Sequence, residues 1–221
     1  MVDPVTSMKL PNRILDPMDR ISEVLFGLIM ALTFTCTLGV ATASHIEVRA
    51  MLIGALGCNL AWGIIDGGVY LLARLNERGR AILSWRAVRD AADVGAAQQI
   101  VANALPPLVA SVLAPAQLEL IRQKLHQSPE PARPRLTKSD WLGALGICLL
   151  SFLSTFPIVI PFLLVGEPRL ALRLSNAVTI AMLFLCGLMY GRCAGFRPVA
   201  MGVSMVALGS ALVGVAIALG G

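Results

Sequence analysis

The first long apolar stretch of the chain carries polar side chains on one helical face. Asp19, Glu23, Met30, Thr33 and Thr37 are separated by 4, 7, 3 and 4 residues. At 100° per residue, these positions fall within about 40° of Asp19, so a helix aligns them in one stripe. Carboxylates at the start of such a stripe can attract a cation and remove its water, and a thioether can bind it further in. The stripe predicts an ion pathway with Asp19, Glu23 and Met30 as metal ligands and with Thr33 and Thr37 lining it.

A second apolar stretch has a matching stripe, formed by Asn59, Gly63, Asp66 and Tyr70. Asp66 has apolar neighbours and no adjacent cation, and an ionisable residue within a membrane segment is by default a functional candidate. Counted from the expected helix ends, Met30 lies about 13 Å deep and Asp66 about 10 Å deep. We therefore expect both to bind one ion as metal ligands, with Asn59 and Tyr70 lining the pathway. This ligand set suits a borderline divalent ion such as Fe²⁺ or Mn²⁺.

Each of these residues also has a structural interpretation. Met30 taken alone suits core packing, and Asp19 with Glu23 suits a solvated first helical turn that the helix dipole favours. Asp66 can instead be satisfied by a structural partner, because the glycines around it, Gly63 and Gly67, form a small-xxx-small pattern typical of helix contacts. Under that interpretation, an Asp66→Asn substitution is tolerated.

A third apolar stretch contains Pro157 and Pro161, which we expect on the pathway. Each proline leaves the carbonyl four residues earlier without its helical donor. Transporters use such broken backbone to coordinate ions, although a kink satisfied by neighbouring side chains is the structural alternative. Asn176 in the fourth stretch is either a pathway residue near its outer end or a helix–helix hydrogen bond. Three glycines predict a packing ladder: Gly187, Gly191 and Gly195.

The composition assigns these stretches to a membrane protein. Of the 221 residues, 57% are hydrophobic and 14% are charged, whereas soluble domains have about 45–50% and about 25%. The mean hydropathy is +0.77. These values exclude a soluble enzyme, a disordered tail and a disulfide-stapled secreted domain. The net charge of +5 favours cytoplasmic loops over nucleic-acid binding. The five cysteines lack the spacing of metal ligands, so we expect small buried hydrophobic residues.

We predict an all-α integral membrane protein with five transmembrane helices and a small cytoplasmic helical insertion between helices 2 and 3. The helices are expected at Ile21–Ala43, Met51–Ala73, Trp141–Val165, Leu170–Gly191 and Pro198–Leu219. The chain then divides into an N-terminal segment (1–20), helices 1 and 2 (21–73), the insertion (74–140) and helices 3 to 5 (141–221). Ala41-Thr42-Ala43 is similar to a cleavage site, but the leader and the apolar stretch before it are too long for a signal peptide.

The basic residues predict an orientation in the membrane. Of the 18 Lys and Arg residues, only Arg49, Arg169 and Arg173 fall on one side of the predicted helices. The positive-inside rule therefore gives a cytoplasmic N-terminus and insertion, and a C-terminus outside. A composition rich in Ala, Arg and Gly favours a bacterial inner membrane.

Within the insertion, the pattern predicts a helix over Leu83–Leu105 that is broken at Pro106-Pro107. A second helix is expected from Pro115 to about Leu125, because proline suits the first helical position. Three prolines in Ser128–Arg135 predict an extended linker.

The layout resembles the vacuolar iron transporter family over roughly residues 19–73 and 141–219. Asp19-Arg20-Ile21-Ser22-Glu23 followed by Gly27 resembles the acidic start of the family's first helix. Ala61-Trp62-Gly63-Ile64-Ile65-Asp66-Gly67-Gly68 is similar to its second helix, and Phe156-Pro-Ile-Val-Ile-Pro-Phe162 to its third. The resemblance implies a homodimer that moves Fe²⁺, and sometimes Mn²⁺, out of the cytoplasm in exchange for protons. It also implies a pathway between the subunits, with an acidic and a methionine ligand from the first two helices.

This chain departs from the family in two respects. Met30 stands where the family has its aspartate, and Asp66 stands where the family has its methionine. The family's insertion is often rich in glutamates that collect metal, whereas residues 74–140 hold ten basic and six acidic residues here. Two of the acidic residues, Asp90 and Asp93, are expected to share a helix face with the neighbouring arginines as a salt-bridged surface.

The sequence thus predicts a homodimeric transporter in the lipid bilayer that exports Fe²⁺ or Mn²⁺ from the cytoplasm by proton exchange. We expect no permanently bound cofactor and no nucleic-acid partner. An enzyme is not expected, because the chain has no Ser-His or H-E-x-x-H arrangement and its histidines, His45 and His126, lie in connections. The alternative is a non-transporting membrane scaffold or interaction protein on the same fold, acting through Leu83–Leu125.

Overall fold

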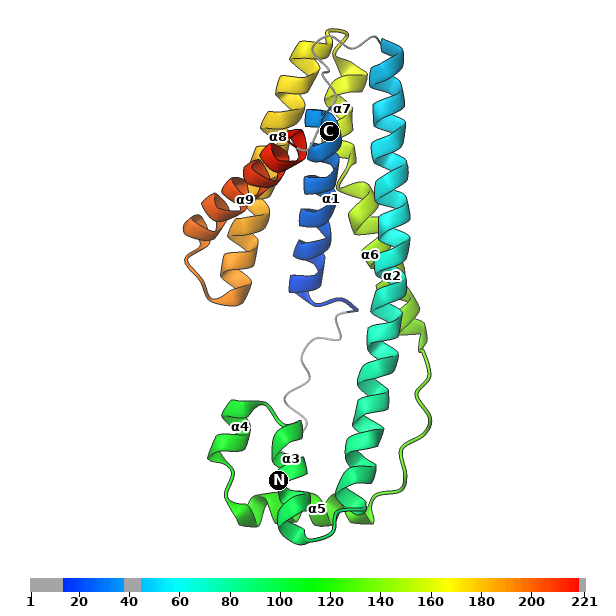
Figure 1. Ribbon diagram of the computed structural model, residues 1–221, viewed down its shortest axis with the longest axis vertical. Coiled ribbons are helices and arrows are strands. Elements are labelled where there is room, and N and C mark those ends of the chain that lie inside the picture. Colours follow the sequence, from blue (N-terminus) through cyan, green and yellow to red (C-terminus); the bar gives the residue numbers. More distant parts are fainter. Residues whose placement is uncertain (1–13, 38–44, 219–221) are drawn as a thin grey trace, which may run out of the picture. The chain divides into compact units, whose positions relative to one another are not determined.

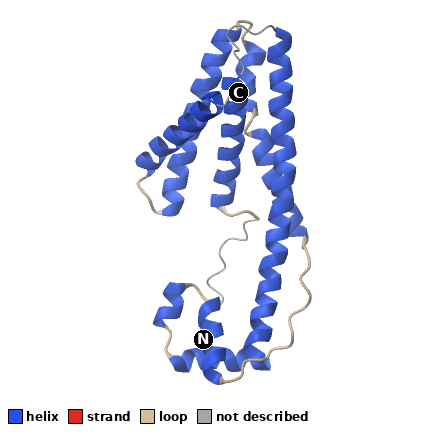
Figure 2. Ribbon diagram, in the orientation of Figure 1, coloured by secondary structure: helices blue, strands red, loops and turns tan. Residues whose placement is uncertain are grey.

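The computed structural model describes residues 14–37 and 45–218, apart from six side chains: Cys36, Thr37, His45, Val213, Ala216 and Ile217. Every regular element within these residues is an α-helix, which confirms the all-α prediction for the described chain (Figure 2). The chain forms two compact units. Unit 1 comprises Met1–Tyr70 and Lys138–Gly221, and unit 2 comprises Leu71–Thr137, three residues earlier at each end than the predicted insertion.

The described part of unit 1 is built from apolar helices (Figure 1). They are α1 (Pro17–Thr37), the first part of α2 (His45–Arg89), α6 (Lys138–Leu153), α7 (Phe156–Leu164), α8 (Pro168–Ala194) and α9 (Pro198–Ala218). The second predicted span, Met51–Ala73, lies within α2, which extends beyond it at both ends. The sequence after Ala73 has good helix formers and no proline, so α2 continues to Arg89.

Three stretches within the described residues are long and apolar enough to cross a membrane. They are Ile46–Arg89, Lys138–Leu164 and Pro168–Ala194, and Pro198–Leu212 is a shorter apolar helix. Large apolar side chains such as Leu163 and Leu164 are 71% and 79% exposed, as expected for surfaces that face lipid. The chain is therefore an all-α membrane protein. Residues 38–43, the end of the first predicted span and its cleavage-like motif, lie outside the described residues.

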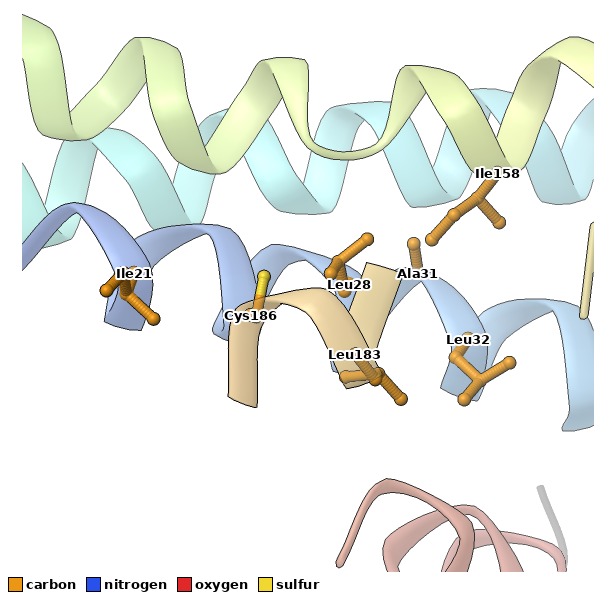
Figure 3. Close-up of a cluster of buried hydrophobic side chains, with 7 residues drawn as sticks. All are labelled: Ile21, Leu28, Ala31, Leu32, Ile158, Leu183 and Cys186. Carbon is orange, nitrogen blue, oxygen red and sulfur yellow. The ribbon is translucent and has the colours of Figure 1, made fainter. Parts of the chain in front are cut away.

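Helix α1 packs against α7 and α8 in the largest hydrophobic core of unit 1 (Figure 3). Its buried residues recur at helical spacing on α1 and meet apolar residues of α7 and α8: Ile21, Leu28, Ala31, Leu32, Ile158, Leu183 and Cys186. A smaller core joins the start of α2 to α7 through Met51 and Val159. Because α1 is held on these sides, the position of its polar stripe relative to its neighbours is fixed.

The predicted span Trp141–Val165 is two helices rather than one, because α6 ends at Leu153 and α7 begins at Phe156. Pro157 lies in the first turn of α7, where a missing N–H costs no hydrogen bond. Pro161 lies inside α7 and is buried. The rings of Phe152 and Phe156 pack edge to face across the break, with 5.2 Å between centroids.

The predicted glycine ladder is confirmed at two of its three positions. A Cβ at Gly187 would lie 2.7 Å from the Gly202 Cα, and one at Gly191 would lie 2.8 Å from the Pro198 Cα, so only glycine permits this approach of α8 to α9. Gly195 does not belong to the ladder. It caps the C-terminus of α8 with φ 74°, a left-handed conformation that favours glycine.

Unit 2 packs the end of α2 against α3 (Val94–Ala104) and α5 (Pro115–Gln127), with α4 (Pro107–Val112) between them in the chain. Its core contains Val88, Ala97 and Val101, covered by Leu118, Ile121 and Leu125 of α5 and by neighbouring apolar residues. The start of α5 at Pro115 and the non-helical linker after Ser128 confirm the predictions for those segments.

The predicted single helix Leu83–Leu105 is wrong, because the chain turns between Arg89 and Val94. The Asp93 carboxylate accepts a 2.7 Å hydrogen bond from the Ala96 backbone N–H and so starts α3 as its N-cap. The predicted salt-bridged surface around Asp90 and Asp93 is also absent from the described contacts. Arg86 instead pairs with Glu130 of the linker, and Arg89 stacks over the Trp85 ring.

Candidate functional site

Glu23, one of the carboxylates predicted as ligands, lies within electrostatic range of two others, Asp66 and Asp19, in unit 1. Glu23 on α1 experiences the charge of Asp66 on α2 and that of Asp19, one turn earlier on its own helix. One oxygen atom of Glu23 (Oε2) and one of Asp66 (Oδ2) are buried and have no hydrogen-bond partner within the described residues. No described cation is paired with either group. Like charges that approach one another away from water are costly unless a cation or a proton neutralises them.

A buried polar cluster lies one turn beyond Glu23, where α1, α2 and the α6–α7 break meet. The Asn59 amide is fully buried and donates to the Gly27 carbonyl at 3.2 Å and to the Thr155 hydroxyl. Gly27 also allows α6 to lie close to α1, because a Cβ there would lie 2.7 Å from the Ser151 carbonyl oxygen and would collide with Ser154. The Asn59 Oδ1 and the Ser151 Oγ are buried without a partner among the described residues.

These unpartnered oxygens lie on matching faces of three helices. On α2, Asn59 and Asp66 are seven residues apart, and Gly63 between them lies against the backbone of Cys148 on α6. On α6, Ser151 follows Cys148 by three residues on the same face. We call Glu23, Asp66, Asn59 and Ser151 the oxygen seam. All four present a buried side-chain oxygen that can accept a bond from a proton donor or coordinate a cation.

Met30 does not lie at the level of Asp66. Its sulfur is 3.5 Å from the Cys58 sulfur, which is eight residues from Asp66 and therefore about 12 Å along α2. The expectation that Met30 and Asp66 bind one ion rested on depths counted from the predicted span ends at Ile21 and Ala73. The contact of Met30 with Cys58 shows that these counts did not give the register between α1 and α2.

The remaining predicted pathway residues make structural contacts. The Thr33 hydroxyl donates to the Ile29 carbonyl of its own helix at 2.9 Å. The Tyr70 hydroxyl donates to the Ile14 carbonyl at 3.4 Å, and its ring packs where a Gly143 side chain would lie. Asn176 is half-buried on α8 and interacts within the chain. The side chain of Thr37 lies outside the described set.

Within the described residues, no three His, Cys, Asp or Glu side chains are arranged to hold a metal ion. Sequence reasoning missed Ser151 and Cys58. Ser151 could have been found from its spacing with Ala144 and Cys148, a small-residue face of α6. Cys58 lies about 80° from the Asp66 stripe, so no helical pattern identifies it.

The four cysteines with described side chains have varied surroundings rather than the uniform burial expected. Cys186 is buried, Cys58 and Cys148 are half-buried, and Cys193 is exposed near the end of α8. In comparisons with family models and with curated proteins, this chain finds no match.

Proposed function

We propose that this protein is a five-span membrane transporter that exports a divalent transition-metal ion, Fe²⁺ or Mn²⁺, from the cytoplasm in exchange for protons. In this proposal, α1, α2, the α6–α7 pair, α8 and α9 span a bacterial inner membrane, with the N-terminus in the cytoplasm and the C-terminus outside. The resemblance to vacuolar iron transporters motivates the substrate and a homodimeric assembly.

One observation carries the proposal. The charge of Asp66 acts on Glu23, and each of the two carboxylates has a buried oxygen without a partner among the described residues. A fold gains no stability from such a pair, because removing a carboxylate from water costs free energy that a partner must offset. A cation or a proton that binds the pair reversibly offsets this free-energy cost, and reversible binding is what a transport site requires.

Proton exchange follows from the same arrangement. A carboxylate can hold a metal ion or a proton, but the two compete for the same oxygen atoms. When the ion leaves Asp66 for the outer side, a proton takes its place and neutralises the group for the return. Asp19, half-buried one turn before Glu23, attracts the cation to the start of the seam.

A membrane scaffold is the second candidate function, and one feature of unit 2 favours it. Helix α4 buries none of its residues, and Leu108 and Val112 are 79% and 75% exposed. Apolar side chains exposed in this way on a charged unit are typical of a surface that another protein covers.

Uptake of Fe²⁺ and Mn²⁺ into proteoliposomes with an imposed pH gradient separates the two functions. The transporter predicts gradient-dependent uptake that Asp66→Asn abolishes. Glu77→Gln is the control, because Glu77 is a 70% exposed carboxylate paired with Arg74 in unit 2. Absence of uptake of either ion by inserted wild-type protein, or full uptake by Asp66→Asn, contradicts the transporter and favours the scaffold.

A further inference from the structure

We propose that Met30 and Cys58 form a second cation site, whose two sulfur ligands favour Fe²⁺ and softer divalent ions over Mn²⁺. This inference adds to the proposed function the class of ion that is selected. The place of the sulfur site along a transport pathway rests on that proposed function. The inference depends on a contact that neither the stripe of α1 nor that of α2 predicts.

The two sulfurs are in direct contact. The Cys58 thiol lies 3.5 Å from the Met30 thioether, the pair joins α1 to α2, and both side chains are half-buried. A thioether accepts the thiol hydrogen weakly, so a metal ion can replace this hydrogen bond at small cost. Met30 is unbranched with three rotatable bonds, which lets its sulfur move aside to admit an ion between the two ligands.

Residue counts along α1 and along α2 place the Met30–Cys58 pair at a similar distance from the carboxylates in unit 1. Met30 follows Glu23 by seven residues, or about 10 Å along α1, and Cys58 precedes Asp66 by eight residues, or about 12 Å along α2. The sulfur pair therefore lies about two helical turns from the carboxylates, on the same two helices. Asn59, the next residue on α2, is fully buried and has an unpartnered Oδ1 at this level.

The donor atoms determine which ions this position favours. Carboxylates at Glu23 and Asp66 accept Mn²⁺ and Fe²⁺ alike, whereas thiolate and thioether ligands favour softer ions and bind Mn²⁺ poorly. When a divalent ion binds, the S–H bond of Cys58 breaks, a metal–sulfur bond forms, and the proton passes to water. Each ion bound at this site therefore releases one proton from Cys58.

The test uses Cd²⁺ as a soft, redox-inert probe and Mn²⁺ as a hard one, with purified full-length protein in detergent. Methyl-labelled methionine reports on Met30 by NMR, and a pH indicator in weak buffer reports released protons. We expect Cd²⁺ to shift the Met30 methyl signal. Cys58→Ser should lower Cd²⁺ affinity by at least about tenfold, since even outer partners of metal ligands contribute that much, and should leave Mn²⁺ affinity unchanged. Cys58→Ser should also release one proton fewer than wild type for each Cd²⁺ bound.

Cys148→Ser is the matched control, because Cys148 is also half-buried and lies on α6 against Gly63 rather than against a thioether. It should leave the Met30 shift and the Cd²⁺ affinity unchanged. A Met30 signal that Cd²⁺ does not move, or an equal Cd²⁺ affinity in wild type and Cys58→Ser, overturns the sulfur site. These readouts measure equilibrium binding without flux, so they distinguish failure of this site from failure of transport at Asp66.

Discussion

Glu23 in unit 1 and Glu119 in unit 2 are both helical glutamates, but their surroundings are opposite. Glu119 accepts two hydrogen bonds from Arg122, at 2.7 and 2.8 Å, and one each from Gln123 and Gln98. Glu23 experiences the negative charges of Asp66 and Asp19, and its buried Oε2 has no partner among the described residues. In unit 2, the Glu119 carboxylate joins α5 to α3 through Gln98, whereas in unit 1 the Glu23 carboxylate keeps an oxygen without a partner among the described residues.

The same contrast extends to the rest of each unit. In unit 2, Asp93 caps α3, and Glu130 pairs with Arg86. In unit 1, the oxygen seam is enclosed by glycines that bring the helices within backbone contact. In the proposed function, these unsatisfied oxygens are kept for a ligand rather than for stability.

The largest change in stability is expected in unit 1, at the glycine of α1 that lies against α6. Gly27→Ala adds a methyl group at a place where a Cβ would lie 2.7 Å from the Ser151 carbonyl oxygen. The helices α1 and α6 must separate, at a cost of about 1–3 kcal/mol in the free energy of unfolding. Denaturant unfolding in detergent measures this change.

Gly68→Ala is the matched control, because a Cβ at Gly68 meets nothing within 4 Å. It should be neutral or stabilising, by up to about 1 kcal/mol, because alanine favours the helix. Equal effects of the two substitutions are incompatible with a tight seam between α1 and α6.

A smaller effect is expected in unit 2, where a polar side chain has its partner. Asp93→Ala removes the N-cap of α3 and should lower the opening free energy of that helix by about 1 kcal/mol. Hydrogen exchange of the amides in the first turn of α3 measures it. Asp90→Ala, in the same turn but outside the cap, should change that exchange little, and an equal loss of protection in both variants argues against the cap.

The smallest effect comes from Glu119, which is partly exposed, and it has a defined pH window. The hydrogen bonds from Arg122, then those from Gln123, lower the pKa of Glu119 from its ordinary 4.5 to about 2. The charged form is therefore favoured in the folded state, and its contribution is complete above pH 4.5 and lost as the pH falls towards 2. Glu119→Gln should reduce exchange protection of α3 and α5 at pH 7, and this difference should shrink by pH 3. A difference that does not vary with pH contradicts this role for the ion pair.

Local signals predicted much of the fold. The Pro115 helix start, the extended linker and the two glycine contacts of α8 follow from the preferences of single residues. The turn at Asp93 was missed because the alanines around it favour helix, although Asp93 is a good N-cap. The prolines predicted broken backbone or a kink in the third apolar stretch, and the structure shows two separate helices, α6 and α7.

The candidate site could be predicted only in part. Helical spacing identified Glu23, Asp66 and Asn59, because each lies on a stripe of its own helix. It could not give the register between α1 and α2, which places the Asn59 side-chain amide against the Gly27 carbonyl. An error of two turns in that register paired Met30 with Asp66 and concealed its contact with Cys58.

The most direct test of the central claim is the thermal unfolding of wild type and Asp66→Asn, each with and without Mn²⁺, with Glu77→Gln as the control. The account predicts that Mn²⁺ raises the unfolding midpoint of wild type and of Glu77→Gln, because an ion that binds only the folded state stabilises it. Without metal, Asp66→Asn should unfold at a higher temperature than wild type, since the charge of a half-buried carboxylate with an unpartnered oxygen has been removed. Mn²⁺ should then have no effect on it. An equal Mn²⁺ shift in wild type and Asp66→Asn would show that the ion binds elsewhere and would contradict the assignment of the oxygen seam.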